Sequence, residues 1–425
     1  MTHLIEAHPQ FWLMLAALIG LQWLLRLVMM TAEFRRRSVL SSHSYSGPPD
    51  QPPRLSMLVA AKDEQENIES CVRSLLTQDY PNLELIVVDD RSNDETPKIL
   101  RRLEQESGGR LQVIHIVHLR DGWFGKNNAM REGVETSTGE WLCFTDADCR
   151  QISTKTLSVA MQEALRHRAD FLTVTPVLEM NTLWEKITQP ICAQTLLFWF
   201  QPRRVNDSQK STAYANGAFM LMKRSCYKTI GGHERVKTEV NEDIQMARFA
   251  KAAGLVLRMV ENDDLYRTRM YGSVADAWRG WSRIFFGSLK SARRLGLSML
   301  SLGMFSILPW IVLILSLIGR IECSPTDAPT WNMLLLAWAG VILVCQAAVW
   351  QFYRFLSIGR VWSLTYPLGA AAALGMLFNA LFKQIGLADT TWRGTTYRGN
   401  QRVDVKAGRA ISLMSSGWRP PSIKD

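Results

Sequence analysis

The stretch Trp141–Asp148 reads WLCFTDAD, an apolar run of strand length that ends in two aspartates. Leu83–Asp90, LELIVVDD, follows the same plan, and Leu55–Ala61, LSMLVAA, is a third apolar run. Between and after them lie segments with the apolar spacing of helices, at 64–77, 96–106 and 126–135, and a further strand at 111–117. This alternation predicts an α/β fold with a mostly parallel sheet and right-handed crossovers. Ligands of such sheets bind at the carboxyl ends of the strands, where these aspartates lie.

Four long apolar runs flank this middle region and predict membrane helices. They lie at Phe11–Met30, Met304–Ile318, Trp331–Trp350 and Leu364–Leu387. No Lys or Arg precedes the first run, whereas three consecutive arginines follow it at 35–37. The positive-inside rule therefore places the N-terminus outside and the middle region in the cytoplasm.

The basic C-terminal tail conflicts with four crossings, which would leave it outside. It carries Arg393, Arg398, Arg402, Lys406 and Arg409. Either one apolar segment is therefore re-entrant or an additional span exists. The segment Leu364–Leu387 is the candidate for a re-entrant hairpin, because Pro367 and several glycines interrupt it.

These features divide the chain into consecutive segments. They are an N-terminal transmembrane anchor (1–34), a Ser/Pro/Gly-rich linker (35–53), the α/β domain (54–277), an amphipathic interfacial segment (278–302), transmembrane or re-entrant helices (303–390) and a basic cytoplasmic tail (391–425). In the interfacial segment, Trp278, Trp281, Phe285 and Phe286 are expected to dip into the bilayer, unless it is an ordinary helix packed on the α/β domain. The predicted location is the cell membrane, with several spans and a cytoplasmic catalytic domain.

Composition excludes several classes of protein. Hydrophobic residues make up 47% and charged residues 21%, which rules out a disordered chain and one wholly embedded in a membrane. The 49 Lys and Arg exceed the 39 Asp and Glu, giving a net charge of +10. Such an excess favours an anionic partner: nucleic acid, a phosphorylated small molecule or acidic lipid headgroups. Scattered cysteines without CxxC spacing indicate neither disulfides nor zinc, and no GxGxxG or P-loop motif is present.

Carboxylates at two strand ends are candidates for binding chemistry. Asp146 and Asp148 flank a tight turn and suit Mg²⁺ or Mn²⁺, which would bridge to phosphate oxygens. Alone, the Asp-x-Asp pattern also occurs in ordinary surface loops. Asp90 could accept hydrogen bonds from a base or ribose, or could simply cap a helix.

Three further positions carry candidate groups. Lys126 follows GWFG at the start of a predicted helix, where it suits a phosphate or is simply solvated. Asp243, after Glu242, opens another helix as a general base or as a first-turn capping residue. Arg393, after the last apolar run, could clamp a diphosphate or could anchor to lipid headgroups.

The order of these motifs resembles the family 2 glycosyltransferases of the GT-A fold. The match covers about 54–283 and rests on LSMLVAAKDEQENI, SLLTQDYPNLELIVVDDRSNDET, GWFGKNNAM, GEWLCFTDADC, NGAFMLMKRSCYKTIGGHE and NEDIQMARFAKAAG. The flanking apolar segments and the WRGxxY ending resemble the membrane-bound branch with ceramide glucosyltransferase and the hopanoid- and carotenoid-associated enzymes. The later QxxRW signature of the family is absent; the region reads WRGWSR at 278–283.

The resemblance implies a role for each matching position. Ala60, Glu64 and Asp90 would line the nucleotide pocket, Lys126 would contact nucleotide or phosphate, Asp146 and Asp148 would hold Mg²⁺ or Mn²⁺ on the diphosphate, and Asp243 would be the catalytic base. The implied enzyme inverts configuration as it transfers a sugar from a nucleotide-diphosphate sugar donor, with UDP favoured, to a hydroxyl of a membrane lipid acceptor. The implied partners are thus the donor, the lipid and the bilayer, with no nucleic acid.

Three other functions remain open from the sequence. A processive polysaccharide synthase would use the same chemistry on a growing polymer, but the missing signature weakens that reading. A nucleotidyltransferase would instead release pyrophosphate. A catalytically inactive membrane scaffold is disfavoured by the carboxylates at the expected strand ends.

Overall fold

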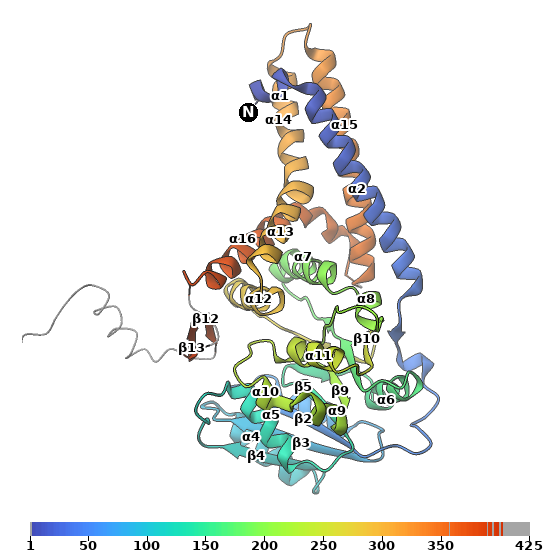
Figure 1. Ribbon diagram of the computed structural model, residues 1–425, viewed down its shortest axis with the longest axis vertical. Coiled ribbons are helices and arrows are strands. Elements are labelled where there is room, and N and C mark those ends of the chain that lie inside the picture. Colours follow the sequence, from blue (N-terminus) through green and yellow to red (C-terminus); the bar gives the residue numbers. More distant parts are fainter. Residues whose placement is uncertain (1, 357, 389, 393–394, 399–400, 403–425) are drawn as a thin grey trace, which may run out of the picture.

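The computed structural model describes residues 2–356, 358–388, 390–392, 395–398 and 401–402. An α/β domain lies at one end of the molecule, and a bundle of long helices forms the other end (Figure 1). Shorter helices lie between the bundle and the α/β domain and separate the two.

The central sheet has eight strands in the order β1-β10-β7-β9-β5-β2-β3-β4. Its strands are β1 (Val39–Leu40), β2 (Leu55–Ala61), β3 (Leu83–Asp90), β4 (Leu111–Ile116), β5 (Trp141–Asp146), β7 (Phe171–Thr175), β9 (Met220–Lys223) and β10 (Leu257–Asn262). All neighbours pair in parallel except β9, which is antiparallel to both β5 and β7. The predicted mostly parallel α/β sheet is confirmed.

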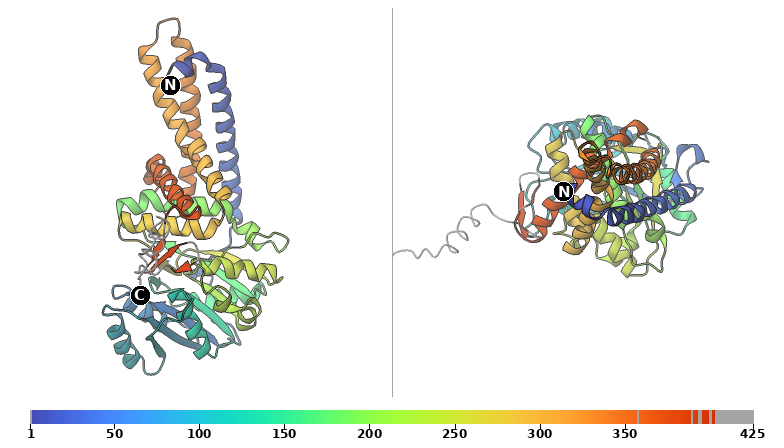
Figure 2. Two further views of the ribbon diagram at one scale, coloured as in Figure 1. Left: turned by 60° about the vertical axis from the view of Figure 1, so that its left-hand side comes forward. Right: turned by 90° about the horizontal axis from the view of Figure 1, so that it is seen from above.

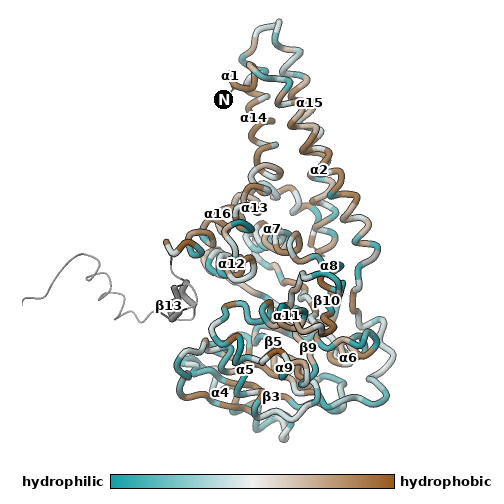
Figure 3. Tube along the Cα trace, viewed as in Figure 1, coloured by the Kyte–Doolittle hydropathy of each residue, from teal (hydrophilic) through white to brown (hydrophobic). Residues whose placement is uncertain are grey.

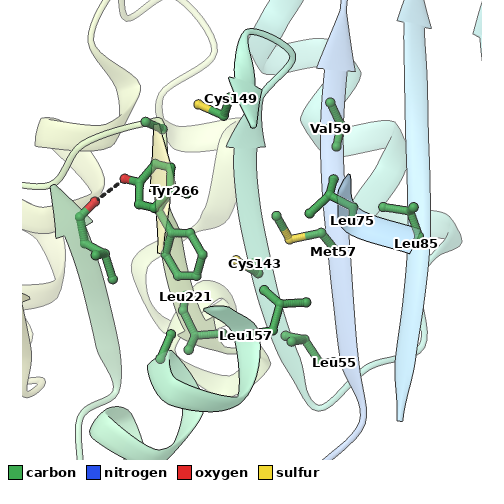
Figure 4. Packing of buried hydrophobic residues seen from close by; sticks show 14 of the residues in the cluster. Leu55, Met57, Val59, Leu75, Leu85, Cys143, Cys149, Leu157, Leu221 and Tyr266 are labelled. Carbon is green, nitrogen blue, oxygen red and sulfur yellow. Dashed lines mark hydrogen bonds between the residues drawn. The ribbon is translucent and has the colours of Figure 1, made fainter. Parts of the chain in front are cut away.

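Helices cover both faces of the sheet. They are α3 (Ile68–Leu76), α4 (Thr96–Glu106), α5 (Gly125–Thr136), α6 (Thr156–Arg166), α9 (Arg224–Ile230), α10 (Gly232–Arg235) and α11 (Glu242–Ala252). Because side chains alternate along a strand, Met57 and Val59 of β2 pack in one core, and Leu58 packs in the other. The first core appears in Figure 4, where the Tyr266 hydroxyl donates to the Val174 carbonyl at 2.6 Å.

The remaining strands of the described residues form two small sheets of three strands each. β6 (Cys149–Gln151), β11 (Tyr266–Thr268) and β8 (Val177–Leu178) form one, directly after the acidic end of β5. β12 (Thr390–Trp392), β13 (Thr395–Arg398) and β14 (Gln401–Arg402) form the other. The first sheet matters for the site, because it fixes the backbone that follows the predicted metal ligands.

Four helical segments are long and apolar enough to cross a membrane: Pro9–Arg35, Ala292–Glu322, Ala328–Phe355 and Arg360–Gln384. They comprise α2 (Pro9–Arg36), then α13 (Ala292–Ser301), η2 (Leu302–Ile307) and α14 (Leu308–Glu322), then α15 (Ala328–Phe355), and finally η3 (Arg360–Thr365) and α16 (Tyr366–Gln384). α2, α14 and α15 stand together in both figures, and the short α1 (Thr2–Ala7) lies at their far end (Figures 1 and 2). Hydrophobic residues, coloured brown, run along most of the length of these helices in Figure 3.

The last apolar segment is one continuous helix rather than the predicted hairpin. Pro367 lies in the first turn of α16, where a missing N–H breaks no helical hydrogen bond. α16 lies at the base of the bundle against α7 (Leu183–Trp199) and α12 (Val274–Leu289), not beside the three upright helices.

The interfacial aromatic residues pack inside the protein, so the expectation that they dip into the bilayer is wrong. Trp281, Phe285 and Phe286 of α12 are buried in the same core as α7 and α16. Trp278 packs on α16, where a Cβ built on Gly375 would lie 2.4 Å from its ring. The aromatic side of α12 therefore meets another helix instead of lipid.

The predicted linker is partly docked on the α/β domain. β1 adds to the sheet edge beside β10, and the 3₁₀ turn η1 (Ser42–Ser44) follows it. The Ser42 N–H donates to Asp264 at 2.8 Å, and the Tyr45 hydroxyl donates to Asp79. Serine and tyrosine hydroxyls thus anchor a stretch whose composition alone indicates a loose connection.

Candidate active site

One cavity of about 730 Å³ opens at the carboxyl ends of β2, β3 and β5. Seven of the predicted site residues line it: Ala60, Glu64, Asp90, Lys126, Asp146, Asp148 and Asp243. They come from five separated stretches of sequence. Parallel pairing of β2 with β3 and β5 brings Ala60, Asp90 and Asp146 to one edge of the sheet, and α5 and α11 contribute Lys126 and Asp243. Arg393 lies outside the described residues.

Lys126 is the cation at the centre of this cavity. Its Nζ lies 2.6 Å from Asp146 Oδ1 and 2.8 Å from Glu242 Oε1. Burial alone would lower the pKa of Lys126, but the two carboxylates raise it well above its usual value. The ammonium is therefore charged at any physiological pH.

Gly217 marks the point where the acidic groups converge. A Cβ built there would lie 3.1 Å from Lys126 Nζ, 3.5 Å from Asp243 Oδ2 and 3.6 Å from Asp146 Oδ2. The Gly217 N–H donates to Asp243 Oδ2 at 2.8 Å, so the backbone itself orients this carboxylate. A glycine lets the backbone approach the charged groups this closely.

Asp243 is a buried carboxylate with a raised pKa. It lies in the first turn of α11, where its Oδ1 also accepts from the Ile244 N–H at 2.7 Å. Burial and the neighbouring Glu242 carboxylate raise its pKa to about 7, against the lowering effect of Lys126 and the backbone donors. A carboxylate with this pKa suits proton transfer near neutral pH.

Asp146 and Asp148 fit a divalent cation. Burial, with the Asp146 and Glu64 carboxylates nearby, raises the pKa of Asp148 to about 7, so a cation bound at this turn would offset like charges. Among the described residues, no three His, Cys, Asp or Glu side chains form a ready cluster. Two carboxylates with the remaining positions left to substrate phosphates and water is a common Mg²⁺ arrangement.

Asp90, which also lines the cavity, is held by its neighbours. Arg91 donates to both of its oxygens, at 2.8 and 3.0 Å, and adopts a left-handed φ of 59° to do so. Lys62 Nζ donates to the carbonyls of Asp90 and Arg91 at 3.2 and 3.1 Å. The sequence-based prediction missed Lys62 and Arg91, although both adjoin predicted strand ends.

The predicted contact of Asp90 with the nucleotide implies that Gly125→Ala weakens nucleotide binding about tenfold or more, because a Cβ there would lie 2.1 Å from Asp90 Oδ2. Displacing that carboxylate disrupts a charge-assisted pair, and about 1.4 kcal/mol corresponds to tenfold. The measurement is the dissociation constant of UDP by calorimetry. Gly340→Ala, in a helix where the new Cβ meets nothing within 4 Å, is the matched control. Equal affinities for the two variants would contradict this view of Asp90.

The wall toward the helix bundle is apolar. Leu196, Leu197 and Phe200 line it from the α7 end, and Phe352 and Phe355 line it from the end of α15. The prediction missed α7 altogether, although its LLFWF stretch at 196–200 is a strong apolar signal. The WRGWSR region does reach the site, because Arg279, Trp281 and Arg283 of α12 line the cavity.

Comparison with known proteins agrees with this geometry. Residues 56–231 match the family described as Glycosyl transferase family 2. The chain is 23% identical over 231 residues to 4,4'-diaponeurosporenoate glycosyltransferase of Staphylococcus haemolyticus, covering 54% of this chain and 60% of that protein. It is 29% identical over 184 residues to beta-monoglucosyldiacylglycerol synthase of Trichormus variabilis, covering 42% and 38%. The chain thus spans less than two thirds of these curated relatives.

A solved structure shares the fold. The mannosyltransferase PcManGT from Pyrobaculum calidifontis, determined with GDP-Man and Mn²⁺, superposes with a TM-score of 0.50 at 18% identity. The superposition covers 90% of this chain and 99% of that one. The chain therefore carries a family 2 glycosyltransferase domain with the GT-A fold.

Proposed function

We propose that this protein transfers a sugar from a nucleotide-diphosphate sugar to a hydroxyl of a membrane lipid, with inversion and with a divalent metal. The observation that carries this proposal is a single cavity with acidic and basic groups at the strand ends and an apolar wall under the helix bundle. UDP is the favoured nucleotide, by resemblance to the membrane-bound branch of the family.

The donor end of the site has the chemistry for a nucleoside diphosphate. Ala60, Glu64 and Asp90 line the proposed nucleotide pocket, and Asp146 and Asp148 would hold Mg²⁺ or Mn²⁺. The cation, when bound, supplies Lewis-acid stabilisation of the charge on the departing diphosphate. Lys126 contributes fixed positive charge beside it, oriented in advance by Asp146 and Glu242.

Asp243 is the proposed base. Its carboxylate accepts the proton of the acceptor hydroxyl as that oxygen attacks the anomeric carbon from the face opposite the diphosphate. A single displacement of this kind inverts the configuration. The Gly217 and Ile244 N–H groups hold the carboxylate in place, and its raised pKa leaves it basic enough to accept a proton near neutral pH.

The acceptor side favours a membrane lipid. The apolar wall from α7 and α15 lies where the α/β domain meets the bundle, so a lipid could present its hydroxyl without leaving the bilayer. Two relatives carry names of lipid or carotenoid glycosylation. With α2, α14 and α15 crossing and α16 at their base, the α/β domain and the C-terminal end of α16 both lie on the cytoplasmic side.

Membranes containing the protein, incubated with a panel of radiolabelled sugar nucleotides, should incorporate label into the lipid extract with one sugar. Product length separates this from a processive synthase, which would give a polymer. Release of pyrophosphate would identify a nucleotidyltransferase. Neither transfer nor hydrolysis with any donor would favour the inactive scaffold and contradict the proposal.

A further inference from the structure

Arg26 is a basic residue inside the first apolar helix, outside the catalytic cavity. It lies four residues before the end of the apolar run Phe11–Met30, or about 6 Å along the helix axis. Its guanidinium stacks over Trp23, Phe198 and Phe305 at 5.0, 6.0 and 5.5 Å from the ring centroids. The side chain therefore turns back into the apolar region instead of reaching toward the α/β domain.

No carboxylate neutralises this guanidinium. In the part of the chain that the structure describes, no ion pair reaches Arg26, and its one hydrogen bond goes to Ser301 Oγ at 3.3 Å. A charge at this depth is costly unless it meets a counter-ion or water, and such residues mark binding sites by default. Aromatic rings attract a cation but do not neutralise it.

Adjacent groups extend the site toward the membrane surface. Arg294 of α13 stacks over Trp199 at 5.4 Å, and the Trp199 Nε1–H donates to Ser298 Oγ at 2.9 Å. Ser298 and Ser301 are three residues apart on the helical stretch that carries Arg294, so both hydroxyls lie on one face. The Phe198 and Trp199 rings, 5.4 Å apart, link the two guanidinium groups.

The site is open to lipid and distinct from the catalytic cavity. Phe198 is 53% exposed, whereas its neighbours Leu197 and Phe200 line the cavity on the other side of the chain. The surroundings are basic, with exposed side chains at Arg203, Arg204, Arg293 and Arg294. These charges favour an anionic ligand that arrives from the headgroup layer.

We propose that α2, α7 and α13 form a binding site for the phosphate of an anionic membrane phospholipid. Arg26 and Ser301 bind the phosphate oxygens, and Arg294 attracts the headgroup at the mouth of the site. Arginine suits this task because its planar donor fork matches phosphate geometry. The bound lipid would brace the end of α7 that forms one wall of the cavity.

The test is the thermal midpoint of the full chain in nanodiscs of phosphatidylcholine alone and in nanodiscs that also contain about 30 mol% phosphatidylglycerol, whose charge gives the bilayer a negative surface potential. Wild type should gain about 2–6 °C with the anionic lipid, because a ligand of the native state stabilises it. Arg26→Gln should lose most of that gain. Ser301→Ala keeps the charge of Arg26 and should lose about half of the gain in thermal midpoint. This second variant keeps the test valid if Arg26→Gln does not fold.

Arg354→Gln is the matched control, because Arg354 is also an arginine of a long apolar helix that stacks over an aromatic ring, Phe34 at 5.5 Å, but its side chain is exposed. It should retain the full gain. The proposed site would be overturned if Arg354→Gln lost as much of the thermal gain as Arg26→Gln, or if Ser301→Ala gained as much as wild type. Either result would point to general surface charge. The same gain from inorganic phosphate in phosphatidylcholine nanodiscs would overturn the assignment to a lipid.

Discussion

Asp243→Asn should lower turnover by about 10²–10⁴-fold and leave the affinity for the nucleotide sugar unchanged. The amide fills the same space beside the Gly217 and Ile244 N–H groups but cannot accept a proton from the acceptor. Single-turnover transfer to lipid gives the rate, and calorimetry with UDP gives the affinity. Full activity in this variant would remove Asp243 from the role of base.

The pH profile offers a second readout of the same group. The base acts as the carboxylate, and burial with Glu242 raises the pKa of Asp243 to about 7. Turnover of wild type should therefore rise with pH and reach half its limiting value near pH 7, and this limb should vanish in Asp243→Asn. Asp121→Asn, at an exposed aspartate outside the cavity, is the control and should keep the wild-type profile.

Asp148→Asn should abolish metal-dependent transfer at any concentration of Mg²⁺ or Mn²⁺ that supports wild type. The substitution keeps the size of the side chain but removes one of two carboxylates that face the diphosphate position. Divalent affinity depends on ligand charge, so Asp148→Asn should no longer bind Mn²⁺ at the concentrations that saturate wild type. Titration of activity with Mn²⁺, and Mn²⁺ binding by electron paramagnetic resonance, measure the effect. An unchanged titration curve would contradict the cation site.

Much of the α/β domain follows from local pattern. Leu83–Asp90 and Trp141–Asp146 are continuous apolar runs that end in acid, and the structure forms parallel strands there. Their polar ends gather because parallel strands share an edge. Residues 96–106 are a helix over the predicted range, since its apolar spacing is regular.

Other features depend on long-range contact and carry no local signal. Lys126 and Glu242 are far apart in sequence, so their ion pair depends on how α5 and α11 meet. β9 is a short segment whose antiparallel pairing depends on its neighbours. Gly217 is one glycine among many until the three charged groups around it are placed.

The membrane region shows the same limit. An amphipathic aromatic pattern predicts an apolar helix face that must be shielded from water, but either lipid or another helix can shield it. In α12 the cover is α16, which explains why Trp281 and Phe285 are buried in protein. The same packing holds α16 at the base of the bundle, away from the three upright helices.

A density map of the full chain in lipid nanodiscs with Mn²⁺ and a non-transferable UDP-sugar analogue would show directly whether three distant acidic stretches serve one donor. We expect density for the ion and the pyrophosphate at Asp146 and Asp148. The nucleobase should lie beside Asp90, and the sugar should face Asp243. Density for the analogue on another face of the domain, or a sugar that points away from Asp243, would contradict the account.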